Sequence, residues 1–122
     1  MPTQQPSEQD VEKMLREYQQ VQEQLRMFAI QLDQLKAQKA EFDRANQEVG
    51  NSTGKVYVSV GGVIVETTKQ KALDDLKDRA ELSETRIQSI TKQYDQLRSR
   101  EKQLNEQITA IYKSSQAPNG AQ

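Results

Sequence analysis

The hydrophobic positions of the chain form two long series with helical spacing, and a short stretch of alternating residues separates them. In the first series they recur every three or four residues between residues 11 and 49, and ten of its twelve positions are apolar. This spacing is typical of the seam along which coiled-coil helices pack, so it predicts a helix over residues 8–49. The seam positions are Val11, Met14, Tyr18, Val21, Leu25, Phe28, Leu32, Leu35, Lys39, Phe42, Asn46 and Val49.

The second series has the same spacing and again ten apolar positions out of twelve. It predicts a second helix over residues 69–113, of nearly the same length as the first. Its seam positions are Leu73, Leu76, Ala80, Ser83, Ile87, Ile90, Tyr94, Leu97, Glu101, Leu104, Ile108 and Ile111.

Local signals mark the ends of these helices. Ser7 followed by Asp10 is a weak N-cap signal for the first helix. Gly50 is the expected stop at its other end, because glycine tolerates the left-handed backbone that often terminates a helix. Thr67, with Gln70 three residues later, forms a possible capping box for the second helix.

The two seams can be aligned with each other, because an antiparallel pair of helices brings together residues whose numbers have a constant sum. The seams coincide when that sum is 122, which places Leu25 opposite Leu97. The polar positions Lys39 and Ser83 then face each other, and such residues fix the register of a coiled coil or extend to solvent. We therefore expect one antiparallel coiled coil, about 60 Å long at 1.5 Å per residue.

Residues 55–68 contain two β-branched runs around Gly61 and Gly62, which predicts a β-hairpin whose two-residue turn has positive φ. Because side chains alternate across a strand, this hairpin has one nearly all-valine face. The expected opposite pairs are Val60 with Val63, Val58 with Val65, and Val56 with Thr67.

An isolated two-stranded hairpin is marginal in water, and the sequence offers no third strand to cover this valine face. We therefore expect several hairpins to join edge to edge. The predicted fold class is mainly α: a long antiparallel two-helix coiled coil connected by one β-hairpin that joins an oligomeric β-barrel. The expected oligomer interface consists of Val56, Val58, Val60, Val63, Ile64 and Val65.

Composition narrows the possible functions. The chain has no Cys and no His, so thiolate and imidazole catalysis and soft-ligand metal sites are excluded, and we expect no enzyme and no metal site. A net charge of -1, from 17 basic and 18 acidic residues, argues against a nucleic-acid partner.

The first thirty residues carry charges throughout, so we expect no signal peptide, no membrane span and a cytoplasmic location. Residues 1–7 and 114–122 are expected to be disordered tails.

Two features suggest ligand sites but are better explained structurally. The loop over residues 50–55 resembles a phosphate-binding loop, yet it is one residue short and runs from helix to strand. Asp74, Asp75 and Asp78 lie in the early turns of the second helix, where carboxylates complement the helix dipole. A metal site there is the weaker interpretation.

The hairpin and the start of the second helix together resemble a known family. The run Lys55-Val-Tyr-Val-Ser-Val-Gly-Gly-Val-Ile-Val-Glu-Thr-Thr-Lys69, continuing into Ala72-Leu73-Asp-Asp-Leu76-Lys77, is similar to the β-type subunits of archaeal prefoldin. The resemblance covers about residues 8 to 113, and a single hairpin is typical of the β class.

The resemblance implies an ATP-independent chaperone, a holdase, that works as a hexamer of two α-type and four β-type subunits. It also implies that unfolded client proteins are held at the tips of the coiled coils and delivered to a group II chaperonin, without a cofactor. Independently, the end of the predicted coil that holds both termini has more apolar side chains than a two-helix seam can bury. These candidate client-binding residues are Val11, Met14, Leu15, Tyr18, Ile108, Ile111 and Tyr112.

Two other interpretations stay open at this point. A structural coiled-coil adaptor or tether would bind a specific partner through the outer faces of its helices and would not need a valine-faced hairpin. A periplasmic-type holdase should have a signal peptide and a strongly basic body, and we expect neither here, since the 17 basic residues are matched by 18 acidic ones.

Overall fold

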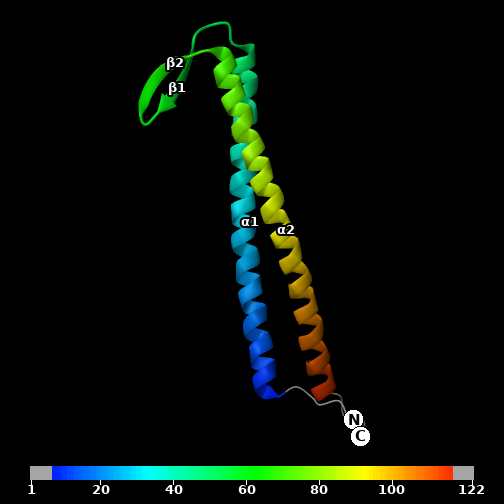
Figure 1. The fold of residues 1–122 in the computed structure, drawn as a ribbon. Coiled ribbons are helices and arrows are strands. Elements are labelled where there is room, and N and C mark those ends of the chain that lie inside the picture. Colours follow the sequence, from blue (N-terminus) through cyan, green and yellow to red (C-terminus); the bar gives the residue numbers. More distant parts are fainter. Residues whose placement is uncertain (1–6, 117–122) are drawn as a thin grey trace. The chain divides into compact units, whose positions relative to one another are not determined.

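The computed structural model describes residues 7–116, which form two helices and two strands in the order α1, β1, β2, α2 (Figure 1). Helix α1 spans Glu8–Asn51 and helix α2 spans Lys69–Gln116. Strands β1 (Val56–Val60) and β2 (Val63–Thr67) form a two-stranded antiparallel sheet. The prediction of a mainly helical chain with two long helices joined by one β-hairpin is confirmed.

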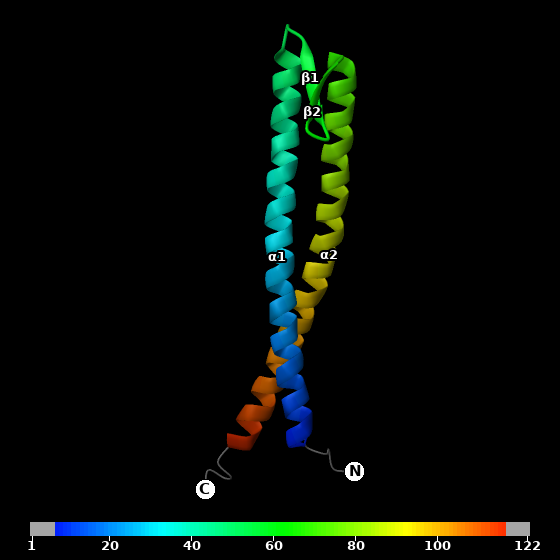
Figure 2. The same ribbon diagram turned by 90° about the vertical axis from the view of Figure 1, so that its left-hand side faces the viewer.

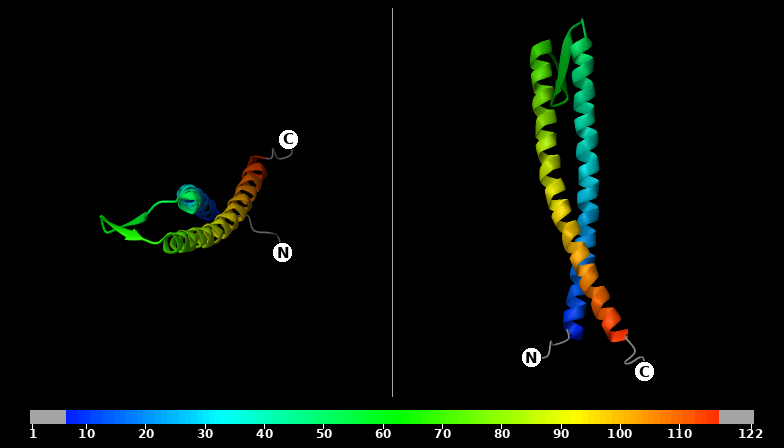
Figure 3. Two further views of the ribbon diagram at one scale, coloured as in Figure 1. Left: turned by 90° about the horizontal axis from the view of Figure 1, so that it is seen from above. Right: turned by 90° about the vertical axis from the view of Figure 1, so that its right-hand side faces the viewer.

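The chain divides into two compact units, and each helix contributes to both. The terminal unit comprises residues 1–29 and 92–122, described over 7–29 and 92–116, and the hairpin unit comprises Ile30–Thr91. Within the hairpin unit, α1 and α2 run side by side (Figure 2), and the hairpin stands away from them to one side (Figure 1, Figure 3).

Burial follows the two predicted seams without exception. All twelve seam positions of α1 and all twelve of α2 are buried or half-buried, while most positions between them are exposed. In the terminal unit, Val21, Leu25 and Leu104 form a buried cluster, and Leu104 has no exposed surface. In the hairpin unit the buried side chains on the seam are Leu32, Ile87 and Ser83. The heptad pattern therefore identified the residues that pack.

Cross-helix contacts agree with the predicted antiparallel register. In the hairpin unit, the Lys39 ammonium lies 3.8 Å from the Glu84 carboxylate, next to the predicted partner Ser83. Lys39 keeps its charged end partly exposed while Ser83 is buried, so the pair combines a small core residue with a long one that extends to solvent. At the end of the same unit, the Lys69 ammonium donates a hydrogen bond of 3.2 Å to the Ser52 carbonyl.

The hairpin has the predicted register. Val60 lies opposite Val63, Val58 opposite Val65, and Val56 opposite Thr67. The turn consists of Gly61 with φ of 55° and Gly62 with φ of 83°, which is left-handed backbone that glycine adopts without a steric penalty. Two successive residues of this kind give the turn whose twist matches that of the flanking strands.

The signal at the start of α1 is confirmed, because the structure contains a reciprocal capping box there. The Asp10 amide donates to the Ser7 hydroxyl at 3.1 Å, and the Ser7 amide donates to the Asp10 carboxylate at 3.2 Å. Both bonds satisfy amides that would otherwise lack a partner at a helix N-terminus.

Two predictions about helix ends were wrong. Gly50 does not stop α1, because the helix continues to Asn51 and Gly50 lacks the positive φ of a left-handed cap. The last turn instead closes with a 3.1 Å bond from the Ser52 amide to the Val49 carbonyl. Thr67 does not cap α2, since it pairs with Val56 as the last residue of β2.

Thr68, one residue later, is the N-cap of α2. Its hydroxyl accepts a 3.1 Å hydrogen bond from the Lys71 amide, and its carbonyl accepts one of 3.0 Å from the Ala72 amide. The Gln70 side chain, which the predicted capping box required, donates instead to the Asp74 carboxylate at 2.9 Å. At its other end, α2 extends to Gln116, three residues past the predicted limit of 113.

Candidate interaction surfaces

The hairpin presents apolar side chains that no other part of its unit covers. Val60, Val63, Val65 and Ile64 are 60%, 62%, 46% and 72% exposed, whereas Val56 and Val58, nearer the base, are half-buried. Such exposure is unusual for residues of this type, because burying a valine or isoleucine side chain is worth about 1.5–3 kcal/mol.

Five of the six predicted interface residues share one face of the hairpin. Val56, Val58, Val60, Val63 and Val65 follow from the observed pairing, and Thr67 completes this face. Ile64 lies opposite Ser59, so it belongs to the other face. Each strand also has one edge without a partner strand in the described chain, because the sheet contains only β1 and β2. The hairpin therefore offers both an apolar face and two open edges.

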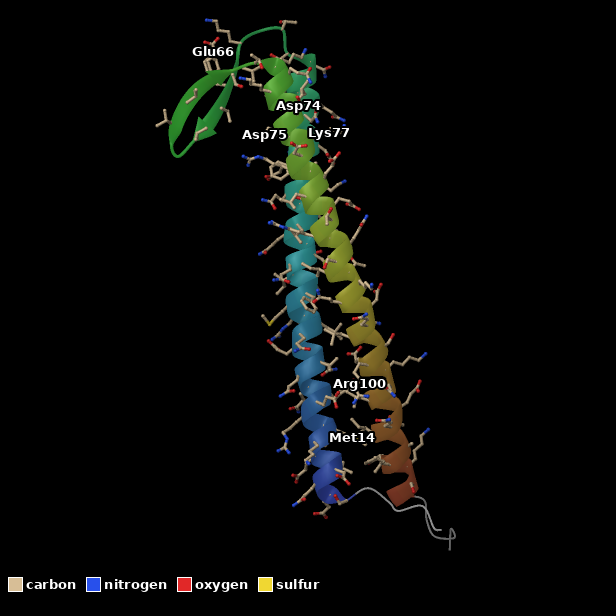
Figure 4. All side chains as sticks on the ribbon, in the orientation of Figure 1. Met14, Glu66, Asp74, Asp75, Lys77 and Arg100 are labelled. Carbon is tan, nitrogen blue, oxygen red and sulfur yellow. The ribbon has the colours of Figure 1, made fainter. Side chains whose placement is uncertain are left out.

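The predicted client-binding residues all lie in the terminal unit, where they differ in burial. Val11, Met14, Tyr18, Ile108 and Ile111 are half-buried seam positions, and Tyr18 packs against the buried cluster of Val21, Leu25 and Leu104. Leu15 and Tyr112 lie off the seam and are 42% and 61% exposed. Met14 on α1 is labelled in Figure 4. The structure thus brings a set of apolar side chains together in one unit, and two of them face outward.

A cross-helix ion pair in the terminal unit was not foreseen from the sequence. The Arg100 guanidinium donates two hydrogen bonds to the Glu17 carboxylate, from Nε to Oε2 at 2.6 Å and from Nη2 to Oε1 at 2.8 Å (Arg100 is labelled in Figure 4). A third bond, from Nη1 to Gln103 Oε1, is 2.9 Å long. These bonds from Arg100 lower the pKa of the Glu17 carboxyl from its ordinary value. A signal for this pair existed, because Glu17 and Arg100 each directly precede a seam residue and so flank the same helix interface.

The carboxylates at the start of α2 are engaged with their own helix. Asp74 accepts a hydrogen bond from Gln70, and Asp75 pairs with Arg79 at 2.9 Å (Asp74 and Asp75 are labelled in Figure 4). Over residues 7–116, no group of three or more acidic side chains is arranged to hold a metal ion. Neither helix has an apolar stretch, within that same range, that is long enough to cross a membrane.

Two long helices that pack along heptad seams and are joined by a single exposed hairpin define a class of coiled-coil subunits. Comparison with known proteins identifies the family. Residues 12–115 match the family described as "Prefoldin subunit". The chain is 36% identical over 100 residues to the prefoldin subunit beta of Methanosarcina acetivorans, covering 80% of this chain and 86% of that relative. It is 32% identical over 102 residues to the prefoldin subunit beta of Pyrococcus furiosus, with coverage of 82% and 87%.

A solved structure agrees with these sequence matches. The crystal structure of the prefoldin beta subunit from Thermococcus strain KS-1 superposes with a TM-score of 0.80 at 31% sequence identity, covering 88% of this chain and 96% of that one. The chain therefore belongs to the prefoldin family and is a β-type subunit, as its hairpin sequence indicated.

Proposed function

We propose that this β-type subunit is part of an ATP-independent holdase, which binds unfolded proteins through the seven candidate residues of its terminal unit named above and delivers them to a group II chaperonin. Membership of a chaperone-type family supports the general role. The observation that carries the site assignment is the exposure of Leu15 and Tyr112 beside the half-buried Met14 and Ile111. A nonnative chain gains free energy by burying its own apolar side chains against such residues.

The second part of the proposal concerns assembly. The exposed valine face and the open edges of β1 and β2 are surfaces that other subunits can cover by extending the sheet. We assign the six hairpin residues named above to this contact, within a cytoplasmic hexamer of two α-type and four β-type subunits. The family resemblance supports this stoichiometry and the transfer to a chaperonin. Neither binding nor assembly requires a cofactor.

Several terminal units on one oligomer can contact the same client. Each contact buries only part of a side chain and is therefore weak, but linking the contacts raises their joint affinity through effective concentration. This arrangement suits clients that differ in sequence, because it depends on apolar area and not on a shaped pocket.

The test replaces exposed residues only, so that the folded state is spared. Leu15→Ser with Tyr112→Ser should abolish most of the protection that the assembled oligomer gives to a denatured test protein diluted into buffer without nucleotide. A matched control, Met27→Ser with Ile30→Ser, removes two side chains of similar exposure, 57% and 53%, from positions outside the proposed site. Light scattering reports aggregation, and native mass reports assembly.

Three results would bear on this proposal. Loss of protection in the first variant alone, at unchanged native mass, supports it. Equal protection by both variants and the wild type places client binding elsewhere on the chain. A wild-type assembly that gives no protection contradicts the holdase function itself.

A further inference from the structure

The two flanks of the helix pair in the hairpin unit carry different chemistry. On one flank, Lys39 pairs with Glu84 at 3.8 Å and with Asp43 at 3.6 Å, so its charges are largely matched. The other flank contains an open groove of about 310 Å³ between the helices. Its lining residues are Gln31, Gln34, Leu35 and Gln38 from α1, with Arg86 and Ile90 from α2.

Of the residues that the structure describes, Arg86 is the only charged one that lines this groove. Among the described residues, none accepts a hydrogen bond from its guanidinium or forms an ion pair with it. Arg79, two turns earlier on α2, is by contrast neutralised by Asp75 at 2.9 Å. The groove therefore has an unmatched positive charge, and its electrostatic complement is a carboxylate.

The glutamines supply the second kind of contact. Gln31, Gln34 and Gln38 follow one another at about one helical turn on α1, and all three are exposed. Each amide has hydrogen-bond donors and an acceptor, as a peptide group does. Their spacing of about 5.4 Å per turn is close to the roughly 6.6 Å over which an extended chain repeats the same side. A row of this kind is suited to the main chain of an extended segment, whose peptide groups are unpaired.

Apolar surface completes the groove. Leu35 and Ile90 line the groove and are half-buried. Leu82 lies one turn before Arg86 on α2 and is 52% exposed, so it extends the apolar surface beyond the positive charge. Along α2 the order is thus apolar, cationic, apolar at a spacing of four residues.

We propose that this groove binds an extended segment of a nonnative chain that has an acidic side chain between apolar ones. The carboxylate pairs with Arg86, the apolar side chains contact Leu82 and Ile90, and the glutamine amides bind the main chain. This inference deepens the proposed holdase function and rests on it. It adds a selective contact to the nonselective apolar contacts of the terminal unit. A helix would fit less well, because its peptide groups are already bonded within it and leave the glutamine amides unmatched.

The experiment measures a preference between two fluorescent peptides on the assembled protein. One peptide alternates Glu with Leu and Ser, and the other has Gln in place of every Glu. We expect wild type to bind the Glu peptide about two- to fivefold more tightly at low salt, because Arg86 is exposed and a single exposed ion pair contributes little. Arg86→Gln should remove this preference. Arg44→Gln is the matched control, because Arg44 is also exposed and without an ion pair in the described residues but lies outside the groove.

A single label locates the binding. The sequence has no Cys, so Ser89→Cys, at an exposed position beside Ile90, carries one environment-sensitive dye. The Glu peptide should change the emission of this dye, and Arg86→Gln should suppress the change.

Equal affinity of wild type for both peptides, no binding of either, or a preference that survives Arg86→Gln would each overturn the groove assignment. The aggregation assay separates this failure from that of the proposed function. A wild-type assembly that protects a denatured protein but shows no peptide preference retains the holdase role and loses the groove. A wild-type assembly that prefers the Glu peptide but protects no denatured protein retains the groove assignment and loses the holdase role.

Discussion

The helix seam and the hairpin face are both apolar, but within residues 7–116 only the seam is covered by the chain itself. Leu104 on the seam has no exposed surface, whereas Val63 on the hairpin is 62% exposed. The seam residues of one helix find partners on the other helix of the same chain. The valine face finds none in the described residues. Helix pairing is therefore a property of the single chain, whereas we propose that the hairpin is covered by other subunits.

The largest effect is expected from charged substitutions on the valine face of the hairpin. Val58→Asp with Val65→Asp places two carboxylates directly opposite each other on the valine face. If that face is buried between subunits, each uncompensated charge should cost several kcal/mol. We expect sedimentation to show dissociation of the assembly, while circular dichroism shows that most helix is retained.

Two single variants, each with one added carboxylate, compare the two faces of the hairpin directly. Val58→Asp should weaken assembly, and Ser59→Asp, on the other face of the same strand, should have a smaller effect. An oligomer that stays intact with Asp at both 58 and 65 would rule out the valine face as the interface.

A smaller effect is expected on the seam side. Leu104→Ala empties a fully buried position in the terminal unit and should lower the free energy of unfolding by about 2–5 kcal/mol. Leu82→Ala, at a position 52% exposed, should change it by less than about 0.5 kcal/mol. Urea unfolding at fixed protein concentration measures both. Similar losses in the two variants would mean that the seam is not the source of the chain's own stability.

The smallest effect concerns the ion pair of the terminal unit. The Arg100 hydrogen bonds lower the pKa of Glu17, so the pair contributes stability above the ordinary carboxyl value of 4.5 and loses it as pH falls through the lowered pKa. Both side chains are over a third exposed, so the contribution is small and is screened by salt. Glu17→Gln should therefore lower the unfolding midpoint at neutral pH and not in strong acid.

The control for this variant is Glu12→Gln, which makes the same change of charge at an exposed residue of the same unit. It should lower the unfolding midpoint at neutral pH by less than Glu17→Gln does. If the two variants had the same pH profile, the hydrogen bonds between Glu17 and Arg100 would not contribute to stability in solution.

Much of this fold could be predicted from the sequence, because it depends on periodicity. The interval of three and four residues identifies Leu25 and Leu104 as packing positions without further information, and the structure buries both. The pairing of Val58 with Val65 follows from the position of Gly61 and Gly62 alone, since a two-residue turn fixes the register of both strands.

The errors arose where local signals compete. Gly50 is a permitted stop but not a required one, and the helical bond between Ser52 and Val49 carries α1 past it. Thr67 and Thr68 are equally good caps by residue type, and strand pairing takes the first and leaves the second to α2. Such choices depend on tertiary contacts, which composition and spacing do not contain.

The candidate sites differ in how much of each could be predicted from the sequence. The alternation of the hairpin identified its valine face, and the burial pattern shows that the described residues leave much of this face uncovered. The client-binding role of Leu15 and Tyr112 stays a prediction, because exposure alone does not identify a ligand. The groove at Arg86 required the structure, since it depends on which carboxylates reach the guanidinium and which do not.

The antiparallel register also predicts the order in which contacts between the helices form during folding. The Lys69–Ser52 contact beside the hairpin joins residues 17 apart in sequence, whereas Glu17 and Arg100 are 83 apart. Closing a short loop costs less conformational entropy than closing a long one, and each closed pair shortens the loop that the next must close. We therefore expect helix pairing to begin beside the hairpin and to proceed toward the chain ends. Local unfolding should follow the opposite order, so that amide hydrogens of the terminal unit exchange with solvent first.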